Sequence, residues 1–244
     1  MKLIKSSFEI LEQSPGLEGI YESIERAGRV CYKSERPEGK TAKDFVDMLI
    51  KRGHLSPLEH GTIYLKVPRN GTMFDYWTKV PSDFNKLWCR AICTLADDYV
   101  YVTTNYRHII ENDLQAYLAF LCEPTEYHER RVSVRINCSI GISREWNRHR
   151  ALATTEDLKS INGLEFSVCE QSTRYCNYSK DKFANQVTFV IPSWVSTIEP
   201  GVYEKIPTDC FPDEFGWARA MKDCEEKYLA LVKYHRTPQE AREV

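Results

Sequence analysis

Two polar stretches of this sequence have residue types suited to an anionic, hydrogen-bonding ligand. Residues 148–150 read Arg-His-Arg, and Glu170, Ser172 and Arg174 follow at alternate positions. Arginine forks match phosphate oxygens in a bidentate way, and a carboxylate can hold a ribose hydroxyl or a base N–H. If the second stretch is extended, its three alternate side chains share one face. Together these residues predict a nucleotide site.

The basic run at residues 148–150 has a simpler interpretation when it is considered alone. Basic residues are common at helix C-termini, where they interact favourably with the helix dipole. The downstream Glu-x-Ser-x-Arg-Tyr pattern at residues 170–175 favours a binding site over a solvated helix end. For the two stretches together, we favour a binding role.

The bulk composition is that of a globular protein without a dominant charge. The chain has 244 residues, of which 42% are hydrophobic and 28% charged, and its formal net charge is −2. This length suits one sizeable core, and we expect a single domain over residues 1–244. Nucleic-acid-binding domains usually carry a basic field, so the charge balance disfavours an RNA-binding module and predicts no nucleic-acid partner. Any anion site must therefore be local.

The sequence also bears on compartment and metal binding. No run approaches the roughly 18 apolar residues of a membrane span, and the N-terminus lacks the apolar core of a signal peptide. The nine cysteines include no Cys-x-x-Cys pair, so we expect reduced, buried apolar thiols in a cytoplasmic protein. His54, Glu59 and His60 loosely suggest metal ligands. No further Cys or His set completes a tetrahedral site, so we expect structural hydrogen bonds and no metal.

Periodicity and capping signals predict the secondary structure. Helix-opening signals occur at residues 14–15, 41–44 and 237–240. Apolar spacing predicts helices over residues 17–27, 41–53, 113–122, 139–147 and 214–234. Alternation predicts strands over residues 63–67, 99–104, 132–136 and 183–191, of which 132–136 is expected to be half-buried. Residues 88–95 suit a helix or a buried strand, and residues 68–81 an irregular connection.

Four separated stretches together resemble the flavin-dependent thymidylate synthases. They are Ala-Gly-Arg-Val-Cys-Tyr at 27–32, Gly-His-Leu-Ser-Pro-Leu-Glu-His at 53–60, Arg-His-Arg at 148–150 with Glu-Gln-Ser-Thr-Arg-Tyr at 170–175, and Thr-Pro-Gln-Glu-Ala-Arg at 237–242. The resemblance spans nearly the whole chain apart from residues 68–137 and 151–164. It implies a mixed α/β (α+β) fold with a central, mostly antiparallel or mixed sheet flanked by helices.

The resemblance also implies a reaction, which is the reductive methylation of dUMP to dTMP. Methylenetetrahydrofolate supplies the carbon, and NADPH supplies electrons through FAD. Activation in that family is attributed to flavin chemistry and to polarisation of the pyrimidine by arginine, so the cysteines are not automatically nucleophiles. The resemblance further implies a homotetramer whose active sites are assembled between subunits.

The family motifs carry over onto this sequence residue by residue. The positions implied for FAD binding are His54, Ser56, Glu59, Arg148, His149, Arg150 and Glu170. The positions implied for dUMP binding are Glu145, Arg148, Glu170, Gln171, Ser172, Thr173, Arg174 and Arg242. The positions implied for catalysis are Arg148, Ser172 and Arg174. Arg242 would lie in the first turn of its predicted helix, where a cation is unfavourable for the dipole, and this favours a functional reason for it.

The sequence departs from the family pattern in three ways. Residues 151–164 separate the two halves of the central motif, and about residues 68–137 form a further inserted region. Cys169 stands where many members carry asparagine, and Glu145 where some carry glutamine. The family also continues beyond the position of Val244, into a segment that binds FAD and polarises dUMP. We expect the sequence to be a fragment of a longer protein, and the alternative is a non-catalytic nucleotide- or flavin-binding relative.

Overall fold

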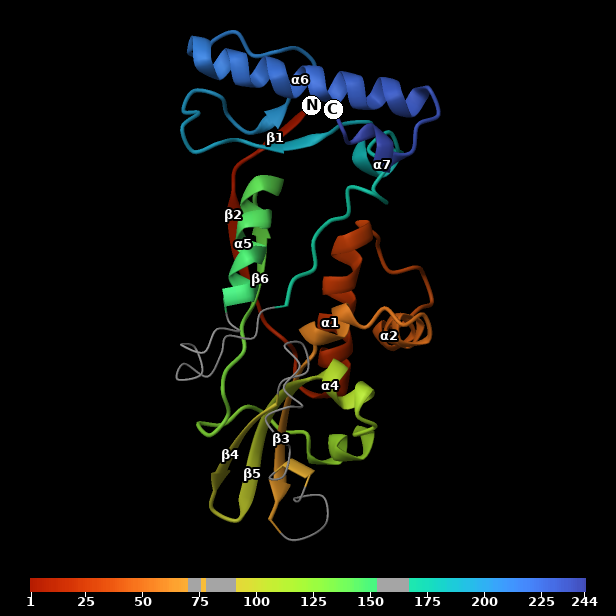
Figure 1. The fold of residues 1–244 in the computed structure, drawn as a ribbon, viewed down its shortest axis with the longest axis vertical. Coiled ribbons are helices and arrows are strands. Elements are labelled where there is room, and N and C mark those ends of the chain that lie inside the picture. Colours follow the sequence, from red (N-terminus) through yellow and green to blue (C-terminus); the bar gives the residue numbers. More distant parts are fainter. Residues whose placement is uncertain (70–75, 78–90, 153–166) are drawn as a thin grey trace. The chain divides into compact units, whose positions relative to one another are not determined.

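The computed structural model describes residues 1–69, 76–77, 91–152 and 167–244, and for residues 148–152 it describes the helical backbone alone (Figure 1). The chain divides into two compact units. The central unit comprises Ile10–Ser133 and Arg148–Glu170, and the terminal unit comprises Met1–Glu9, Val134–Asn147 and Gln171–Val244. Each unit has its own hydrophobic core.

Helix α1 (Gly16–Tyr32) supplies one wall of the core of the central unit. Ile20 and Ile24, four residues apart, lie on its buried face, as the apolar spacing predicts. The helix ends at Lys33, whose left-handed backbone (φ 44°) lets its N–H reach carbonyls in the last turn. The predicted helix is therefore present and extends five residues beyond Ala27.

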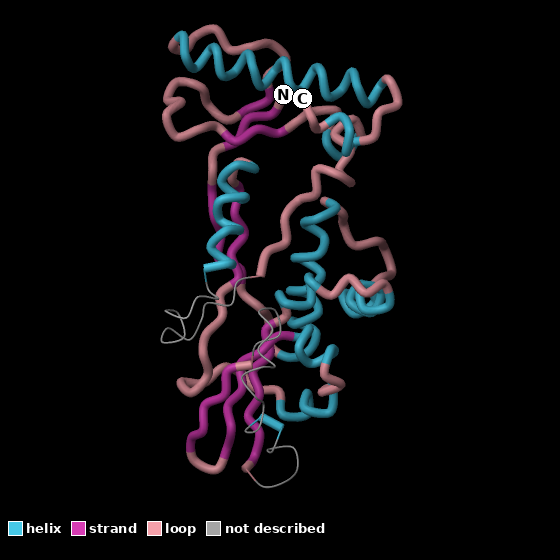
Figure 2. The backbone as a smooth tube through the Cα atoms, in the orientation of Figure 1, coloured by secondary structure: helices cyan, strands magenta, loops and turns pink. Residues whose placement is uncertain are grey.

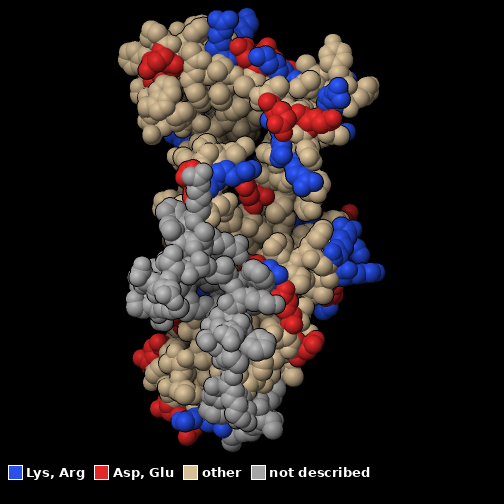
Figure 3. All heavy atoms as spheres, viewed as in Figure 1, with Lys and Arg blue, Asp and Glu red and all other residues tan. Residues whose placement is uncertain are grey.

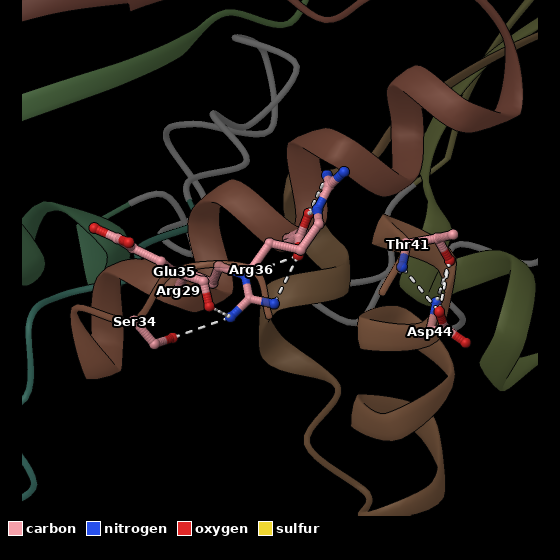
Figure 4. Close-up of polar contacts among 7 residues, drawn as sticks. Arg29, Ser34, Glu35, Arg36, Thr41 and Asp44 are labelled. Carbon is pink, nitrogen blue, oxygen red and sulfur yellow. Dashed lines mark hydrogen bonds and ion pairs between the residues drawn. The ribbon is translucent and has the colours of Figure 1, made fainter. Parts of the chain in front are cut away.

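Helix α2 (Ala42–Lys51) begins with the predicted capping box. The Asp44 N–H donates to Thr41 Oγ1 at 3.1 Å, and the Thr41 N–H donates to Asp44 Oδ2 at 2.8 Å (Figure 4). These bonds satisfy amide groups that the first helical turn leaves without partners. Gly53 follows the helix with a φ of 68°, a conformation that side chains with a Cβ rarely adopt.

A three-stranded antiparallel sheet forms the rest of the central core (Figure 2). Its order is β3 (Thr62–Pro68), β5 (Tyr99–Asn105) and β4 (Ile92–Ala96), and Leu65 pairs with Val102 in the middle of the register. The apolar residues that alternate along β3 are buried, because they face the helices. The sheet and helices enclose one continuous apolar cluster.

Short helices connect the sheet to the rest of the central unit. Helix α4 (Tyr106–Glu111) directly follows β5, and its cap Asn105 accepts a hydrogen bond from the His108 N–H at 2.9 Å. Two 3₁₀ helices, η1 (Ser56–His60) and η3 (Gln115–Phe120), precede β3 and follow α4. Pro57 lies in the first turn of η1, where its missing N–H has no cost.

The terminal unit contains a small mixed sheet and the longest helix. Strand β1 (Lys2–Ile4) pairs in parallel with β7 (Thr188–Val190) and antiparallel with β8 (Gly201–Val202). Helix α6 (Pro212–Lys233) contributes Ala218 to a core that also contains Leu3.

The remaining elements are a ribbon and three short segments. Strands β2 (Ser7–Leu11) and β6 (Ser133–Asn137) form a two-stranded sheet, and α5 (Ile140–Leu152) follows β6. A 3₁₀ turn, η5 (Asp181–Phe183), precedes β7. Helix α7 (Pro238–Ala241) closes the described chain with the predicted Thr237/Glu240 capping box.

The mixed α+β class is confirmed, and the strands of the described residues form three small sheets. The helices predicted at residues 17–27, 41–53, 139–147 and 214–234, the capped C-terminal helix, and the strands at 63–67 and 99–104 are present. No helix in the described part of the chain has the length and apolar character needed to cross a membrane. The single-domain assignment stays a prediction.

Four local expectations differ from the structure. Residues 113–122 contain a 3₁₀ helix over 115–120, and the strand expected at 183–191 is limited to 188–190, because Ala184 and Asn185 adopt positive φ angles that interrupt it. The strand at 132–136 is present, but its apolar side chains are exposed. Within residues 88–95 the strand begins at Ile92, and 88–90 lie outside the described residues, as do most of residues 68–81.

A buried carboxylate stabilises the C-terminal half of α1. Glu25 Oε1 accepts from Arg29 Nε at 2.8 Å, and Glu25 Oε2 accepts from Arg36 Nε at 2.8 Å. Arg29 also donates to Ser34 Oγ and to the Glu35 carbonyl, at 3.3 and 2.7 Å (Figure 4). Burial raises the pKa of Glu25, but the hydrogen bonds from the two arginines outweigh it and hold this pKa below its ordinary value.

We predict that Glu25→Gln lowers the free energy of unfolding by about 2–3 kcal/mol at pH 7, because two guanidinium groups lose their charge partner. The depressed pKa means that this stabilisation is fully present above the unfolded pKa of about 4.3 and is lost as the pH falls through the folded value. Urea unfolding between pH 7 and pH 3 measures both effects. Glu22→Gln, at an exposed position of the same helix, is the control, and equal losses in the two variants would contradict the prediction.

Candidate functional site

Glu59 is the centre of a polar cluster in the central unit. It lies on η1 and is 3% exposed. Its Oε1 accepts from Arg107 Nη1 at 2.9 Å, and its Oε2 accepts a hydrogen bond from the Ser167 hydroxyl. Arg107 also pairs with Glu111 at 2.8 Å within α4. The carboxylate therefore joins three segments that are far apart in the sequence.

Of the predicted flavin-side residues, Ser56 is the first residue of η1 and His54 lies two residues before it. Both are exposed, whereas the following Pro57 and Leu58 are buried. An imidazole and a hydroxyl beside a fixed carboxylate are hydrogen-bonding groups that suit the hydroxyl and phosphate oxygens of a nucleotide cofactor. The local structure thus anchors the carboxylate and leaves these two polar groups accessible.

Residues 167–170 lie against the same cluster. The Ser167 hydroxyl donates to Glu59 Oε2. The structure therefore fixes the start of the segment that carries Glu170 to the predicted residue Glu59, although 108 positions separate Ser167 from Glu59.

The metal interpretation of His54, Glu59 and His60 finds no counterpart in the described ranges. There, no group of three or more His, Cys, Asp and Glu side chains is placed to hold a metal ion. Glu59 directs its oxygens to Arg107 and Ser167.

A second cluster lies in the terminal unit, where residues 171–175 meet α7. Arg242 Nη1 donates to Thr173 Oγ1 at 2.9 Å, and Arg174 Nε donates to Gln239 Oε1 at 3.2 Å. Two guanidinium groups are thus held near each other by a hydroxyl and an amide, which are neutral acceptors. Among the described residues, the one ion pair of these two guanidinium groups is an exposed contact of Arg242 with Glu243 at 3.7 Å. Such a pair of guanidinium groups suits an incoming phosphate.

Charged side chains of both signs are interspersed over the described residues on the face shown in Figure 3. The formal net charge of −2 likewise gives no overall attraction for anions. A site for an anion on this chain would therefore have to be formed by local groups, and Arg174 and Arg242 are the predicted ones.

The segment around Ser172 is not extended, contrary to the expectation. Residues 173–175 form a turn, in which Ser172 Oγ accepts from the N–H groups of Arg174 at 3.2 Å and Tyr175 at 3.3 Å. This hydroxyl-to-backbone turn is a common alternative to extended structure after serine. The hydroxyl keeps its own proton for donation to a ligand. The side chains of Glu170, Ser172 and Arg174 therefore do not share one face in the way that an extended segment would place them.

The position of Arg242 also differs from the expectation. Helix α7 ends at Ala241, and Arg242 is its C-cap, not a first-turn residue. A cation at a helix C-terminus is favourable, so the argument from an unfavourable dipole was wrong. The contact with Thr173 is the better reason to consider Arg242 functional.

The other predicted site residues are placed as follows. Glu145 is exposed on α5, and Gln171 donates to the Tyr178 hydroxyl at 3.2 Å. Arg148, His149 and Arg150 belong to the last turns of α5, but their side chains lie outside the described part of the structure. Of the insert at residues 151–164, positions 153–164 also lie outside the described residues.

The comparison with known protein families gives a match over most of the chain. The family described as thymidylate synthase complementing protein matches residues 15–72 and 123–244. The chain belongs to this family. No curated protein and no solved structure gives a significant match. Membership supports a thymidylate synthase-related function in nucleotide biosynthesis, in a family that in general uses flavin.

The matched residues contain most of both clusters. Glu59, Ser167, Arg174 and Arg242 lie within them, whereas Arg107 lies between the two matched segments. Sequence reasoning missed Arg107, and its only local signal is the Arg-x-x-x-Glu spacing with Glu111, which is typical of an ordinary helical ion pair. It also missed Ser167 as a partner of Glu59, because hydroxyls have no distinctive spacing.

We predict that Glu59→Gln lowers the free energy of unfolding by about 1.5–3 kcal/mol, because a buried charged hydrogen-bond network loses its central acceptor. Guanidinium chloride unfolding measures the loss. Glu111→Gln removes the other, more exposed carboxylate partner of Arg107, and we expect less than about 1 kcal/mol for it. A larger effect at Glu111 than at Glu59 would show that Glu59 does not organise the cluster.

Proposed function

We propose that this chain is a flavin-dependent thymidylate synthase that converts dUMP to dTMP, using methylenetetrahydrofolate as the carbon donor and NADPH as the reductant. Family membership supports the coarse assignment. One observation carries the proposal further. Where residues 171–175 contact α7 in the terminal unit, Arg174 donates to Gln239 and Arg242 donates to Thr173. Two clustered guanidinium groups with neutral partners suit the phosphate of a nucleotide.

The residues on η1 fit FAD on chemical grounds. FAD, when bound, supplies hydride transfer between NADPH and the pyrimidine. Glu59 is held in place by Arg107 and Ser167, so it can accept hydrogen bonds without losing its position. Ser56 and His54, both exposed, can contact cofactor oxygens.

On the dUMP side, the residues divide into binding and orienting roles. Arg174 and Arg242 would bind the phosphate, and Gln171 and Thr173 would add hydrogen bonds. Ser172, whose oxygen already accepts two backbone N–H groups, would donate its proton to the ligand. The resemblance implies that Arg148 lies near both dUMP and FAD and takes part in catalysis. It also implies that His149 and Arg150 contact FAD, that Glu145 binds dUMP, and that Glu170 binds dUMP close to the flavin.

The proposal is tested with purified protein. We expect a yellow protein, or one that gains a flavin spectrum on adding FAD, together with NADPH oxidation that produces dTMP from dUMP and methylenetetrahydrofolate. A colourless protein that binds neither FAD nor dUMP would contradict the proposal. Binding of dUMP with no turnover would favour a non-catalytic nucleotide-binding relative.

We predict that Arg174→Ala weakens dUMP binding by about 2–4 kcal/mol, because a charged hydrogen-bond partner of the phosphate is removed. Isothermal titration calorimetry measures this change. Arg219→Ala, at an exposed position of α6 in the same unit, is the matched control and should bind normally. Unchanged affinity in Arg174→Ala would remove this residue from the site.

We further propose that the chain works as a homotetramer. In support, apolar side chains are exposed on the β2–β6 ribbon and on α5: Phe8, Val134, Ile136, Ile140, Ile142 and Trp146. Phe8 is 73% exposed and Ile142 56%. Several large apolar groups in adjoining elements are unusual on a surface that contacts only water.

We predict that Val134→Lys combined with Ile142→Lys reduces the mass of the assembly, because burying two ammonium groups at an interface is costly. Light scattering after size-exclusion chromatography measures this mass. Leu95→Lys, at an apolar residue exposed to a similar degree (55%) on β4, is the control. The same mass in the double variant and in the unmodified chain would place the interface elsewhere.

A further inference from the structure

The segment of residues 122–131 is attached to the three-stranded sheet of the central unit near both of its ends. The Cys122 N–H donates to the Tyr64 carbonyl at 3.0 Å, and the Arg131 N–H donates to the Tyr64 hydroxyl at 3.2 Å. Between these two contacts lies His128, which is only 6% exposed. A buried histidine therefore occupies the part of the segment that is held by side-chain packing.

The His128 ring packs edge-on against two tyrosines of the sheet. Its centroid lies 5.3 Å from that of Tyr64 on β3 and 5.4 Å from that of Tyr101 on β5. The Tyr127 ring also packs on Tyr101, with centroids 4.8 Å apart. Tyr101 is 3% exposed. The two neighbouring rings of the segment thus cover this part of the sheet.

Two backbone groups determine where the His128 ring carries its proton. The Thr125 N–H lies 3.0 Å from Nδ1, and the Leu65 carbonyl lies 3.1 Å from Nε2. An amide N–H can only donate and a carbonyl oxygen can only accept. The ring is therefore neutral, with its proton on Nε2 and its lone pair on Nδ1.

A second proton would have to bind at Nδ1, which faces a donor. The Thr125 hydroxyl, also 3.0 Å from Nδ1, can turn so that its oxygen accepts from a protonated ring. The Thr125 amide cannot turn in this way, and it would lose its acceptor. A charged imidazolium would also remain away from water between two tyrosine rings. Both effects oppose protonation while the segment stays in place.

The charges around the ring act in the same direction. The titratable groups that face it are Tyr64 on β3, Tyr101 on β5 and Cys122, whose sulfur lies 3.9 Å from Nε2. Among the described residues, no carboxylate is hydrogen-bonded or ion-paired to the ring, and Glu126 and Glu129 of the same segment are exposed. Burial and the positive charge of Arg130 lower the pKa of His128, and the bond to the Leu65 carbonyl only partly offsets them.

We propose that His128 is an acid-sensitive latch, which holds residues 122–131 on the sheet while its ring is neutral and releases them when Nδ1 takes up a proton from solvent. The new N–H displaces the Thr125 N–H, and the imidazolium reaches water by leaving the sheet. Release uncovers the rings of Tyr64 and Tyr101. The latch is independent of the proposed function, because each of its contacts lies between residues 64 and 131 of the central unit.

The direction of the pH dependence follows from the lowered pKa of His128. Between the pKa of a solvated histidine, about 6.5, and the lower value of the latched ring, the released segment binds a proton that the latched segment does not. The latch is therefore at full strength above about pH 6.5 and weakens as the pH falls toward the lower value. Over this range the equilibrium constant for release rises about tenfold for each pH unit.

Amide hydrogen exchange of the full chain, followed by mass spectrometry, tests the release directly. Exchange at pH 7.5 is compared with exchange at pH 5.0, after correction for the pH dependence of the chemical exchange step. We expect the protection of residues 122–131 to fall by about tenfold or more at the lower pH, whereas the amides of α1 keep their protection. Equal protection of residues 122–131 at the two pH values overturns the proposal.

His128→Gln separates titration of this ring from a general effect of acid. Glutamine takes up no proton in this range, so residues 122–131 of the variant should show the same protection at both pH values, whether they stay attached or are released. His235→Asn is the control, at an exposed histidine whose positive φ asparagine tolerates, and it should keep the acid-dependent loss. An equal loss in His128→Gln and the unmodified chain would assign the release to another group and exclude the latch.

A second measurement needs no substitution, so it holds even if His128→Gln does not fold. The slow exchange of the carbon-bound ring hydrogen Hε1, read from the peptide that contains His128, gives the midpoint of protonation. We expect a midpoint below the ordinary value of about 6.5. In Arg130→Gln it should rise, because a positive charge is removed. A midpoint at or above 6.5 in the unmodified chain would show that the sheet does not favour the neutral ring, and it would overturn the proposal.

Discussion

A carboxylate that leaves water must find charged or hydrogen-bonding partners, and this constraint organises the central unit around Glu59. Its two oxygens are satisfied by a guanidinium from α4 and a hydroxyl from residue 167. To provide both partners, the chain must bring η1, the helix after β5 and the 167–170 segment to one point. The position of the 167–170 segment, which carries Glu170, depends on that convergence.

In the terminal unit, Arg174 and Arg242 are held by neutral partners. Arg174 and Arg242 are bound by an amide and a hydroxyl, so their charges are positioned without being neutralised by a buried acid. The capping box at Thr237 and Glu240 sets the direction of α7, and thereby the place where Arg242 leaves the helix. The same unit also buries a paired carboxylate, because Glu225 contacts Lys222 and the N-terminal ammonium group. Arg174 and Arg242 differ from that arrangement in having neutral hydrogen-bond partners.

Sequence reasoning predicted the elements whose signals are local. The Thr41/Asp44 and Thr237/Glu240 capping boxes, and the apolar spacing of Ile20 and Ile24, gave helix positions directly, because each signal is complete within a few residues. The turn at residues 173–175 was missed because the Ser172 hydroxyl competes with extended pairing. The partners of Glu59 were missed because tertiary folding alone brings those residues together. The exposure of the apolar side chains of β6 was also missed. Alternation of apolar and polar residues predicts which side chains share a face of a strand, but not whether another element covers that face.

Arg107 lies between the two segments that match the family, residues 15–72 and 123–244. It nevertheless pairs with the carboxylate of Glu59, which lies in the first of these segments. The intervening stretch also provides β5, the middle strand of its sheet. A shortened version in which a brief loop joins residues 72 and 123 would therefore lose β5 from the middle of the sheet. It would also leave the buried Glu59 carboxylate without the charge of Arg107. Anyone grafting or minimising this protein would have to carry α4 along with the matched segments, or replace Glu59 by an uncharged side chain at the same time.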